Sequence, residues 1–398
     1  MDTTPSFLDL GISTAVVEAL KARNILAPFP IQALVMEDAL AGHDVLAKSK
    51  TGSGKTLGFS IPIVERLEKG AATPSALVLV PTRELAQQVS EDITPIATAR
   101  GLKVGVAYGG VSINEQAKGV GKAHIIIATP GRLEDLAERR MVSLGTIRIL
   151  VLDEADRMLD MGFQPQVDRI VRRLPKDRQT MFFSATLDGD AGRIAQAYTR
   201  EARRHEVVSE TKMVDSIDHR FVPVSAQGKV DALVEILEKD RGLTLVFVRT
   251  KRGADRLVHK LKQRGLRVEG MHGDMTQPAR QKALKRFEAG SVDVLVATDV
   301  AARGLDLDGI SHVINFDPPE DDKAYVHRIG RTARAGRSGI GVTLVTAEQQ
   351  GDVSRLAARL DLHEEFQEEG MKVAPPRTVF SGSKSGRRSS LRSRGRRR

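Results

Sequence analysis

The sequence predicts an α/β protein made of two similar domains, each a mostly parallel sheet flanked by helices, followed by a basic tail. Short apolar runs alternate with longer segments of helical period, which is typical of βα units around a parallel sheet. The alternation occurs twice along the chain. At 398 residues the chain is also too long for one ordinary core.

Each half contains six apolar runs that we expect to be strands. In the first half they lie at residues 45–47, 76–80, 104–107, 124–128, 149–152 and 180–183. In the second half they lie at residues 220–224, 244–248, 267–270, 292–297, 312–315 and 342–345. Residues 208–216 are polar and aperiodic, so we expect a linker between an N-terminal domain at 1–207 and a C-terminal domain at 217–374.

The positive charge of the chain is concentrated at its C-terminal end. The formal net charge is +10, and residues 377–398 carry +9 of it through eight arginines and one lysine, with no acidic residue. Residues 375–398 are rich in Ser, Gly and Arg and cannot support a packed core, so we expect them to be disordered. The remaining chain is nearly neutral.

The composition excludes several kinds of site. The chain has no cysteine, which excludes disulfides, thiolate metal sites, iron–sulfur clusters and cysteine nucleophiles, and which fits a reducing compartment. No apolar run approaches the length of about 18 residues that a membrane span needs. The first residues, Met1–Pro5, show no apolar segment of a signal peptide. We therefore expect a cytoplasmic protein.

Three carboxylates follow the predicted strand at 149–152. Asp153, Glu154 and Asp156 would repel one another unless a cation or a proton compensated them. Magnesium is the natural candidate, because it binds through one or two carboxylates plus substrate phosphates. The alternative is a polar strand end that leads into a solvated helix.

A glycine-rich segment, Gly52–Thr56, lies between the predicted strand at 45–47 and a helical segment at 57–67. Glycines let backbone N–H groups approach phosphates, Lys55 can neutralise them, and the Thr56 hydroxyl can reach magnesium. This segment gives the acidic cluster a partner: Asp153 would hold the metal, and Glu154 would orient or deprotonate the attacking water.

Phosphoryl transfer also needs positive charge on the phosphates in the transition state. The segment His327–Arg334 offers three arginines, and Gly336-Arg337 follows it. If the segment is helical, Arg331 and Arg334 lie at i and i+3 and share a face. The alternative is an ordinary solvated surface.

About ten such segments occur in order between Phe7 and Thr346, and together they closely resemble the DEAD-box RNA helicases. The matching segments are Phe7 with Pro28–Gln32, Thr51–Thr56, Pro81–Ala86, Gly109-Gly110, Thr129–Arg132, Asp153–Asp156, Ser184–Thr186, Val246–Val248, His272–Asp274, Ala297–Asp306 and His327–Arg334. The resemblance implies two tandem RecA-like domains and the use of ATP with Mg²⁺.

The resemblance also implies residue roles, with Gln32 reading the adenine edge, Asp306 contacting the ribose, and Arg331 and Arg334 reaching the γ-phosphate. The residues implied to bind ATP are Phe7, Gln32, Thr51, Gly52, Ser53, Gly54, Lys55, Thr56 and Asp306. Those implied in hydrolysis are Lys55, Asp153, Glu154, Arg331 and Arg334, with Thr56 and Asp153 at the metal. Those implied to couple ATP to RNA are Ser184, Thr186, Asp156 and His327. Those implied to contact RNA are Pro81, Thr82, Arg83, Gly110, Thr129, Pro130, Gly131, Arg132, Gly273, Thr298 and Arg303.

Thr82 and Thr129 each follow a predicted strand and begin a helical segment, and Pro130 suits the first helical position. A helix N-terminus can hold a phosphate, here assisted by Arg83 and Arg132. The alternative is ordinary helix capping. Contacts to the RNA backbone alone would give little sequence specificity, because phosphates carry no base information.

Three positions depart from the family pattern. Ile25 stands where an aromatic residue usually stacks on adenine, so stacking is reduced to an aliphatic contact. Ser49 replaces a small residue at the start of the phosphate loop, beside Lys48 and Lys50. Ala333 replaces a common glycine between the arginines, which favours helix slightly.

The resemblance implies that ATP and RNA close the cleft across 208–216 and that closure opens short RNA duplexes locally, in a monomer. Two alternatives remain at this point: an ATP-gated RNA clamp with little unwinding, and a DNA-directed helicase. The tail at 377–398 is expected to tether RNA electrostatically, and its alternative is a solubilising end.

Overall fold

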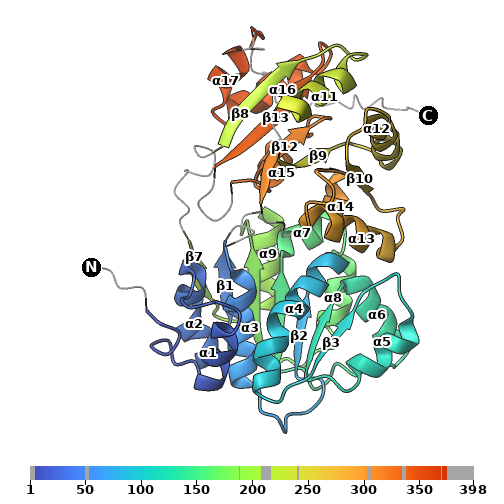
Figure 1. Cartoon of the computed structure of the whole chain (residues 1–398). Coiled ribbons are helices and arrows are strands. Elements are labelled where there is room, and N and C mark those ends of the chain that lie inside the picture. Colours follow the sequence, from blue (N-terminus) through green and yellow to red (C-terminus); the bar gives the residue numbers. More distant parts are fainter. Residues whose placement is uncertain are drawn as a thin grey trace, which may run out of the picture.

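The computed structural model describes residues 5–49, 53–187, 189–207, 217–239, 242–302, 307, 309–333, 338–368 and 370–373. The expected linker at 208–216 and the expected disordered tail at 375–398 lie outside this part of the chain. Figure 1 shows two bodies stacked one on the other, the first formed by the blue-to-green elements and the second by the yellow-to-red elements.

The first body contains a seven-stranded sheet in the order β3-β4-β2-β5-β6-β1-β7, with every neighbouring pair parallel. Its strands are β1 (Val45–Lys48), β2 (Ala76–Leu79), β3 (Val104–Ala107), β4 (Ile125–Ala128), β5 (Ile149–Asp153), β6 (Gln179–Ser184) and β7 (Arg203–Glu206). The central strands β2, β4 and β5 are fully buried and are apolar apart from Asp153 at the end of β5, as expected of parallel strands covered on both faces.

Two apolar cores cover the two faces of this sheet. One core is built with α1 (Thr14–Lys21), α2 (Pro30–Ala41), α3 (Lys55–Arg66) and α4 (Arg83–Ala99). The other is built with α5 (Ile113–Val120), α6 (Pro130–Glu138), α7 (Ala155–Asp160), α8 (Gln164–Val171) and α9 (Gly189–Tyr198).

The second body contains a six-stranded parallel sheet in the order β10-β11-β9-β12-β13-β8. Its strands are β8 (Ile217–Pro223), β9 (Leu243–Phe247), β10 (Val268–Met271), β11 (Val294–Ala297), β12 (Ile310–Asn315) and β13 (Gly339–Val345). One face packs on α11 (Lys229–Lys239) and α12 (Lys251–Gln263). The other packs on α13 (Gln277–Glu288), α14 (Asp299–Ala302), α15 (Asp322–Ile329), α16 (Gln350–Arg359) and α17 (His363–Glu368). In Figure 1, α13 and α14 lie on the side that meets the first body.

All twelve predicted strands are present, and the prediction of two sheet domains is confirmed. The sequence did not predict β7, because Arg203–Glu206 is polar and mostly exposed. It pairs with β1 at the edge of the sheet, where no apolar face has to be buried. None of the helices in the described ranges is long and apolar enough to cross a membrane.

Candidate nucleotide and RNA site

The carboxyl edge of the first sheet divides into two groups of neighbouring strands. The strands β5, β6 and β1 lie side by side, and they lead into the acidic cluster, into Ser184–Thr186 and into the phosphate loop. The strands β3, β4 and β2 also lie side by side, and they lead into the segments implied to contact RNA. Parallel strands end at the same edge, so strand order places the two kinds of segment at adjacent sites.

The phosphate loop ends where α3 begins. Gly54 is the N-cap and has φ +82°, a left-handed conformation that glycine adopts at little cost. Lys55 is 6% exposed, and its Nζ makes no hydrogen bond to any residue that the structure describes. The hydroxyl groups of Ser49 and Ser53 hydrogen-bond to each other, so the unusual serine joins the two ends of the loop. Thr51 and Gly52 lie outside the described residues.

A buried ammonium group without a partner is costly unless an anion joins it. The Lys55 Nζ therefore fits a negatively charged group held at the N-terminus of α3, where backbone N–H groups also favour negative charge. The residues present fit a phosphate-bearing ligand at this position.

The acidic cluster is buried, so the alternative of a solvated strand end is wrong. Asp153, Glu154 and Asp156 are 2%, 3% and 4% exposed. Burial raises the pKa of Asp153 to about 6, with Lys55 opposing that shift and Glu154 adding to it. The Glu154 backbone has φ +51°, which is uncommon for a residue with a side chain.

Glu154 responds in the opposite direction. Burial alone would raise its pKa, but the charges of Arg157, Lys55 and Arg331 outweigh burial and lower the pKa to about 2. Arg157 donates to Glu154 Oε2, and both side chains are 4% exposed. Two adjacent carboxyl groups thus differ widely in pKa. Asp153 is partly protonated near pH 6, whereas Glu154 stays charged at neutral pH.

Thr186 meets the acidic cluster from the end of β6. Its backbone N–H donates to Asp156 Oδ2 at 3.2 Å and its hydroxyl donates to the same oxygen at 3.3 Å. The N–H also lies 3.3 Å from the Ser184 hydroxyl. The sequence placed these three residues in one coupling group, and the structure brings them together.

The arginine segment of the second body differs from its prediction. The helix α15 ends at Ile329, so Arg331 lies beyond it, and Ala333 has φ +53°. The expectation that Ala333 favours helix is therefore wrong, because this position takes a left-handed conformation that glycine would adopt more readily. Arg331 is 3% exposed, which contradicts the alternative of a solvated surface for this residue. Arg334 lies outside the described residues, as do Arg303 and Asp306.

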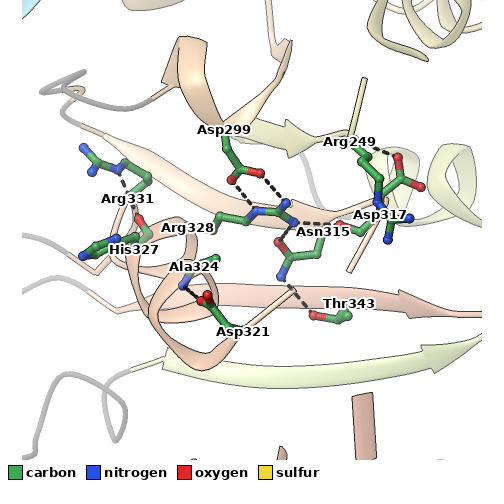
Figure 2. Close-up of polar contacts among 10 residues, drawn as sticks. All are labelled: Arg249, Asp299, Asn315, Asp317, Asp321, Ala324, His327, Arg328, Arg331 and Thr343. Atoms are coloured by element: carbon green, nitrogen blue, oxygen red, sulfur yellow. Dashed lines mark hydrogen bonds and ion pairs between the residues drawn. The ribbon is translucent and has the colours of Figure 1, made fainter. Parts of the chain in front are cut away.

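Arg328 is the buried residue that anchors this segment (Figure 2). Its guanidinium donates to both carboxylate oxygens of Asp299, at 2.6 and 2.7 Å, and to Asn315 Oδ1 at 3.0 Å. It also donates to the Asp317 carbonyl at 2.7 Å and lies over the ring of Phe247. Arg328 thereby joins α15 to the ends of β9, β11 and β12, and it precedes Arg331 by three residues.

Arg331 and His327 reach the first body. They line a cavity of about 10 Å³ together with Arg157, Asp299 and Arg328. Arg157 belongs to the first body and the others to the second. The positive charge of Arg331 is also one cause of the low pKa of Glu154. The two bodies therefore contribute charged groups to a single site.

Gln32 is fully buried beside the phosphate loop. Its Nε2 donates to the Gly54 carbonyl at 2.8 Å, and its Oε1 accepts from the Phe29 N–H at 3.0 Å. Phe7 is 2% exposed and belongs to the core beneath this segment. Ile25 also packs against that core.

On the neighbouring half of the edge, the Thr82 hydroxyl accepts from the Leu85 N–H at 3.2 Å, so the expected cap of α4 is present. Pro130 occupies the first turn of α6, and its N-cap, Thr129, makes no side-chain cap bond. The helix start therefore leaves the Thr129 hydroxyl available to another acceptor or donor.

The two arginines of this half lie close together. The Arg83 guanidinium covers the turn at Gly110, whose φ is +88°. Arg132 donates to Gln116 Oε1 at 2.6 Å and to the Val111 carbonyl at 3.0 Å. Burial and the charge of Arg83 lower the pKa of Arg132, while Asp135 opposes the shift. A pair of like charges this close favours a bound anion.

The second body contributes Gly273 after β10 and Thr298 after β11, which are neighbouring strands. Gly273 is exposed, and a methyl group placed on it would lie 3.3 Å from Cε of Lys251. The predicted RNA residues of this body that the structure describes therefore share one edge.

A buried ion pair between the two bodies has no clear signal in the sequence. Arg280 of α13 lies 3.1 Å from Glu84 of α4, and the two side chains are 11% and 6% exposed. Gln277 Nε2 donates to the same carboxylate oxygen at 3.3 Å. A polar pair at i and i+3 at the start of a helix was the only sequence signal, and it is common on solvated helices.

Comparisons with known proteins agree with this architecture. Residues 29–194 match the model of the DEAD/DEAH box helicase family, and residues 228–336 match that of the helicase conserved C-terminal domain. The DEAD-box ATP-dependent RNA helicase CshA of Bacillus licheniformis is 42% identical over 349 residues, which cover 87% of this chain and 72% of that protein. CshA of Geobacillus kaustophilus is 41% identical over 353 residues, covering 88% and 76%.

Solved structures are also similar. The S. cerevisiae protein Dbp5, bound to RNA and ADP BeF3, superposes with a TM-score of 0.79 at 31% identity and covers 91% of this chain and 94% of that one. Mss116p bound to ssRNA and AMP-PNP superposes with a TM-score of 0.82 at 27% identity, covering 90% and 78%. The chain therefore belongs to the DEAD-box family of ATP-dependent RNA helicases.

Proposed function

We propose that the protein binds ATP and RNA together and uses ATP hydrolysis to unwind or remodel short RNA duplexes or RNA–protein complexes locally. The observation that carries this proposal is that Arg331 of one body acts electrostatically on Glu154 of the other, beside a buried Lys55 whose Nζ makes no hydrogen bond within the described part of the chain. Such a site is complete only when the two bodies are together.

On the nucleotide side, Lys55 and the N–H groups of the loop hold the phosphates, and Gln32 reads the base. Asp153 and Thr56 would hold a magnesium ion, which neutralises charge on the phosphates when bound. Because Lys55 Nζ and the Asp153 carboxyl are both buried, the residues fit a phosphate with its cation.

Glu154 orients the attacking water. A carboxylate whose pKa is about 2 is a weak base. Glu154 is therefore better suited to orient the water by accepting a hydrogen bond from it than to remove a proton from it. Arg331 stabilises negative charge that develops on the γ-phosphate. We assign Arg334 the same role and Asp306 a ribose contact, on the family resemblance alone.

On the RNA side, the N-termini of α4 and α6 with Arg83 and Arg132 hold backbone phosphates. Pro81, Pro130 and Gly131 shape these two ends, and Gly110 forms the turn that Arg83 covers. Gly273, Thr298 and Arg303 continue the path on the second body. Backbone contacts of this kind carry little base information, so binding is largely independent of sequence.

The two ligands favour the closed arrangement together. Asp156, Ser184, Thr186 and His327 connect the phosphate site to the second body, so either ligand biases the same two-state closure. In support, two proteins that superpose on this chain, Dbp5 and Mss116p, are bound to RNA and a nucleotide analogue. We further propose that the protein acts as a monomer in the cytoplasm, which fits its lack of cysteine.

The variant Glu154→Gln tests the assignment. It should bind ATP and RNA normally and lose about 10²-fold or more in RNA-stimulated ATPase rate, because the attacking water is no longer held in position. Glu138→Gln is the matched control, because Glu138 is exposed and lies on α6. Normal turnover in Glu154→Gln would refute its role.

The wild-type protein tests the function itself. RNA should stimulate the ATPase more than DNA of equal length, and a short RNA duplex should be displaced in the presence of ATP. Equal stimulation by DNA would indicate a DNA-directed helicase. Stimulation by RNA without displacement would indicate an ATP-gated clamp.

A further inference from the structure

Phe29, at the edge of the nucleotide site, is unusual both as a helix N-cap and as an exposed aromatic residue. It is the N-cap of α2, a position that favours Ser, Thr, Asp or Asn because their side chains accept a hydrogen bond from the helix. The residue is also 53% exposed. Within the described ranges it is the only aromatic side chain among the exposed large apolar residues. Local rules are broken most often at functional sites.

The ring lies against the phosphate loop. A methyl group placed on Gly54 would lie 2.7 Å from Phe29 Cδ2 and 2.6 Å from Gln32 Nε2. Phe29 and Gln32 are also linked directly, because Gln32 Oε1 accepts the Phe29 N–H at 3.0 Å. An apolar ring and a side-chain amide therefore border the same stretch of loop, where the phosphates of a nucleotide would be held.

The family position for base stacking cannot serve here. Ile25 stands at that position, and it packs against the core beneath the Gln32 segment. A nucleobase has a flat, weakly hydrated face and a polar edge. Phe29 offers a surface for the face, and Gln32 offers hydrogen-bonding groups for the edge.

We propose that Phe29 forms the aromatic wall against which the base of the bound nucleotide packs, so that it sets base affinity in place of the missing aromatic residue at position 25. This inference rests on the proposed ATP site. It explains why an exposed aromatic residue occupies the N-cap of α2, since a threonine would cap the helix but offer no stacking surface.

The variant Phe29→Trp provides a direct probe, because the chain contains no other tryptophan. ATP binding should change the fluorescence of Trp at this position, and inorganic tripolyphosphate, which lacks a base, should leave it unchanged. Equal changes with the two compounds would overturn the proposal, because the ring would then sense loop movement and not the base.

The variant Phe29→Thr supplies the functional arm. Its KM for ATP at saturating RNA should rise ~5- to 100-fold, the effect of losing one base–aromatic stack, while kcat stays within twofold. Its melting temperature should stay level or rise, because threonine can cap α2. Leu26→Ala is the matched control, as Leu26 is 68% exposed in the same segment.

An unchanged KM in Phe29→Thr, or an equal rise in Leu26→Ala, would overturn the role of the ring. Failure of the proposed function would look different. The wild-type protein would then show no RNA-stimulated ATPase, while the tryptophan signal would still report whether the base binds beside residue 29.

Discussion

The ion pair between Glu84 and Arg280 should control how tightly ATP and RNA are coupled. Glu84 belongs to the first body and Arg280 to the second, so the pair exists only when the bodies are together. We expect Glu84→Gln to weaken closure without disturbing either domain, because glutamine keeps the size of the side chain and the acceptor for Gln277.

The size of the effect follows from the geometry. Two unit charges 3.1 Å apart attract by about 5 kcal/mol at an effective dielectric constant of about 20. Desolvation of both groups offsets much of this attraction. Truncating one partner of a buried charge pair at an interface costs about 2–5 kcal/mol, partly because the other charge is left buried. We take about 2 kcal/mol as the loss on closure, which corresponds to ~30-fold.

The assay is RNA affinity measured with and without a non-hydrolysable ATP analogue. With the analogue, Glu84→Gln should bind RNA ~30-fold more weakly than wild type, and without nucleotide the two proteins should bind equally. Glu91→Gln is a control of opposite sign. Burial, and to a smaller extent the charge of Glu91, raises the pKa of Glu288. The two glutamates repel each other across the same contact between α4 and α13, so removing the charge of Glu91 should favour closure slightly.

Equal weakening of RNA binding in both conditions would refute the reasoning. That result would place Glu84 in the RNA contact itself, next to Arg83, and not in the closure of the two bodies. No change in either condition would show that hydration of the separated groups balances the pair.

Two further predictions concern the acidic cluster and the tail. Burial raises the pKa of Asp153 to about 6 from 3.8, so its folded state binds the proton more tightly and the free energy of unfolding falls as pH rises from about 4 to about 6. In magnesium-free buffer, Asp153→Asn should therefore be more stable than wild type at pH 7.5 by about 1–3 kcal/mol and nearly equal at pH 4, as measured by denaturant unfolding; a pH-independent difference would contradict the assignment. Removal of residues 375–398 should lower RNA affinity and reduce the slope of log affinity against log salt by about 0.7 for each RNA phosphate that the tail neutralises, with the RNA-saturated ATPase rate unchanged. An unchanged salt slope would leave the tail a solubilising end.

Much of the fold and of the site could be predicted because the responsible residues are contiguous. Each buried strand is an apolar run, and the phosphate loop and acidic cluster follow such runs directly. The edge strand β7 could not be found in this way, since Arg203–Glu206 is held by pairing with β1 and not by burial.

Other features depend on residues from distant segments. Arg328 is 4% exposed because Asp299, which follows β11, and Asn315 and Asp317, at the end of β12, surround its guanidinium. A basic run in the sequence cannot show whether such partners exist. The left-handed conformation of Ala333 was missed for a related reason, since helix propensity is a weak preference that tertiary packing overrides.

The sequence alone determined which chemical groups the protein possesses: an ammonium group, carboxylates and arginines, which are the groups that phosphoryl transfer on a nucleotide uses. The tertiary structure decided what state each group is in. Asp153 and Glu154 are adjacent and equally buried, yet the pKa of the first is raised to about 6 and that of the second is lowered to about 2. The difference arises because Arg157 and Arg331 face Glu154, and Arg331 comes from the other body. Coulombic interactions depend on distance in space, and the sequence does not contain those distances.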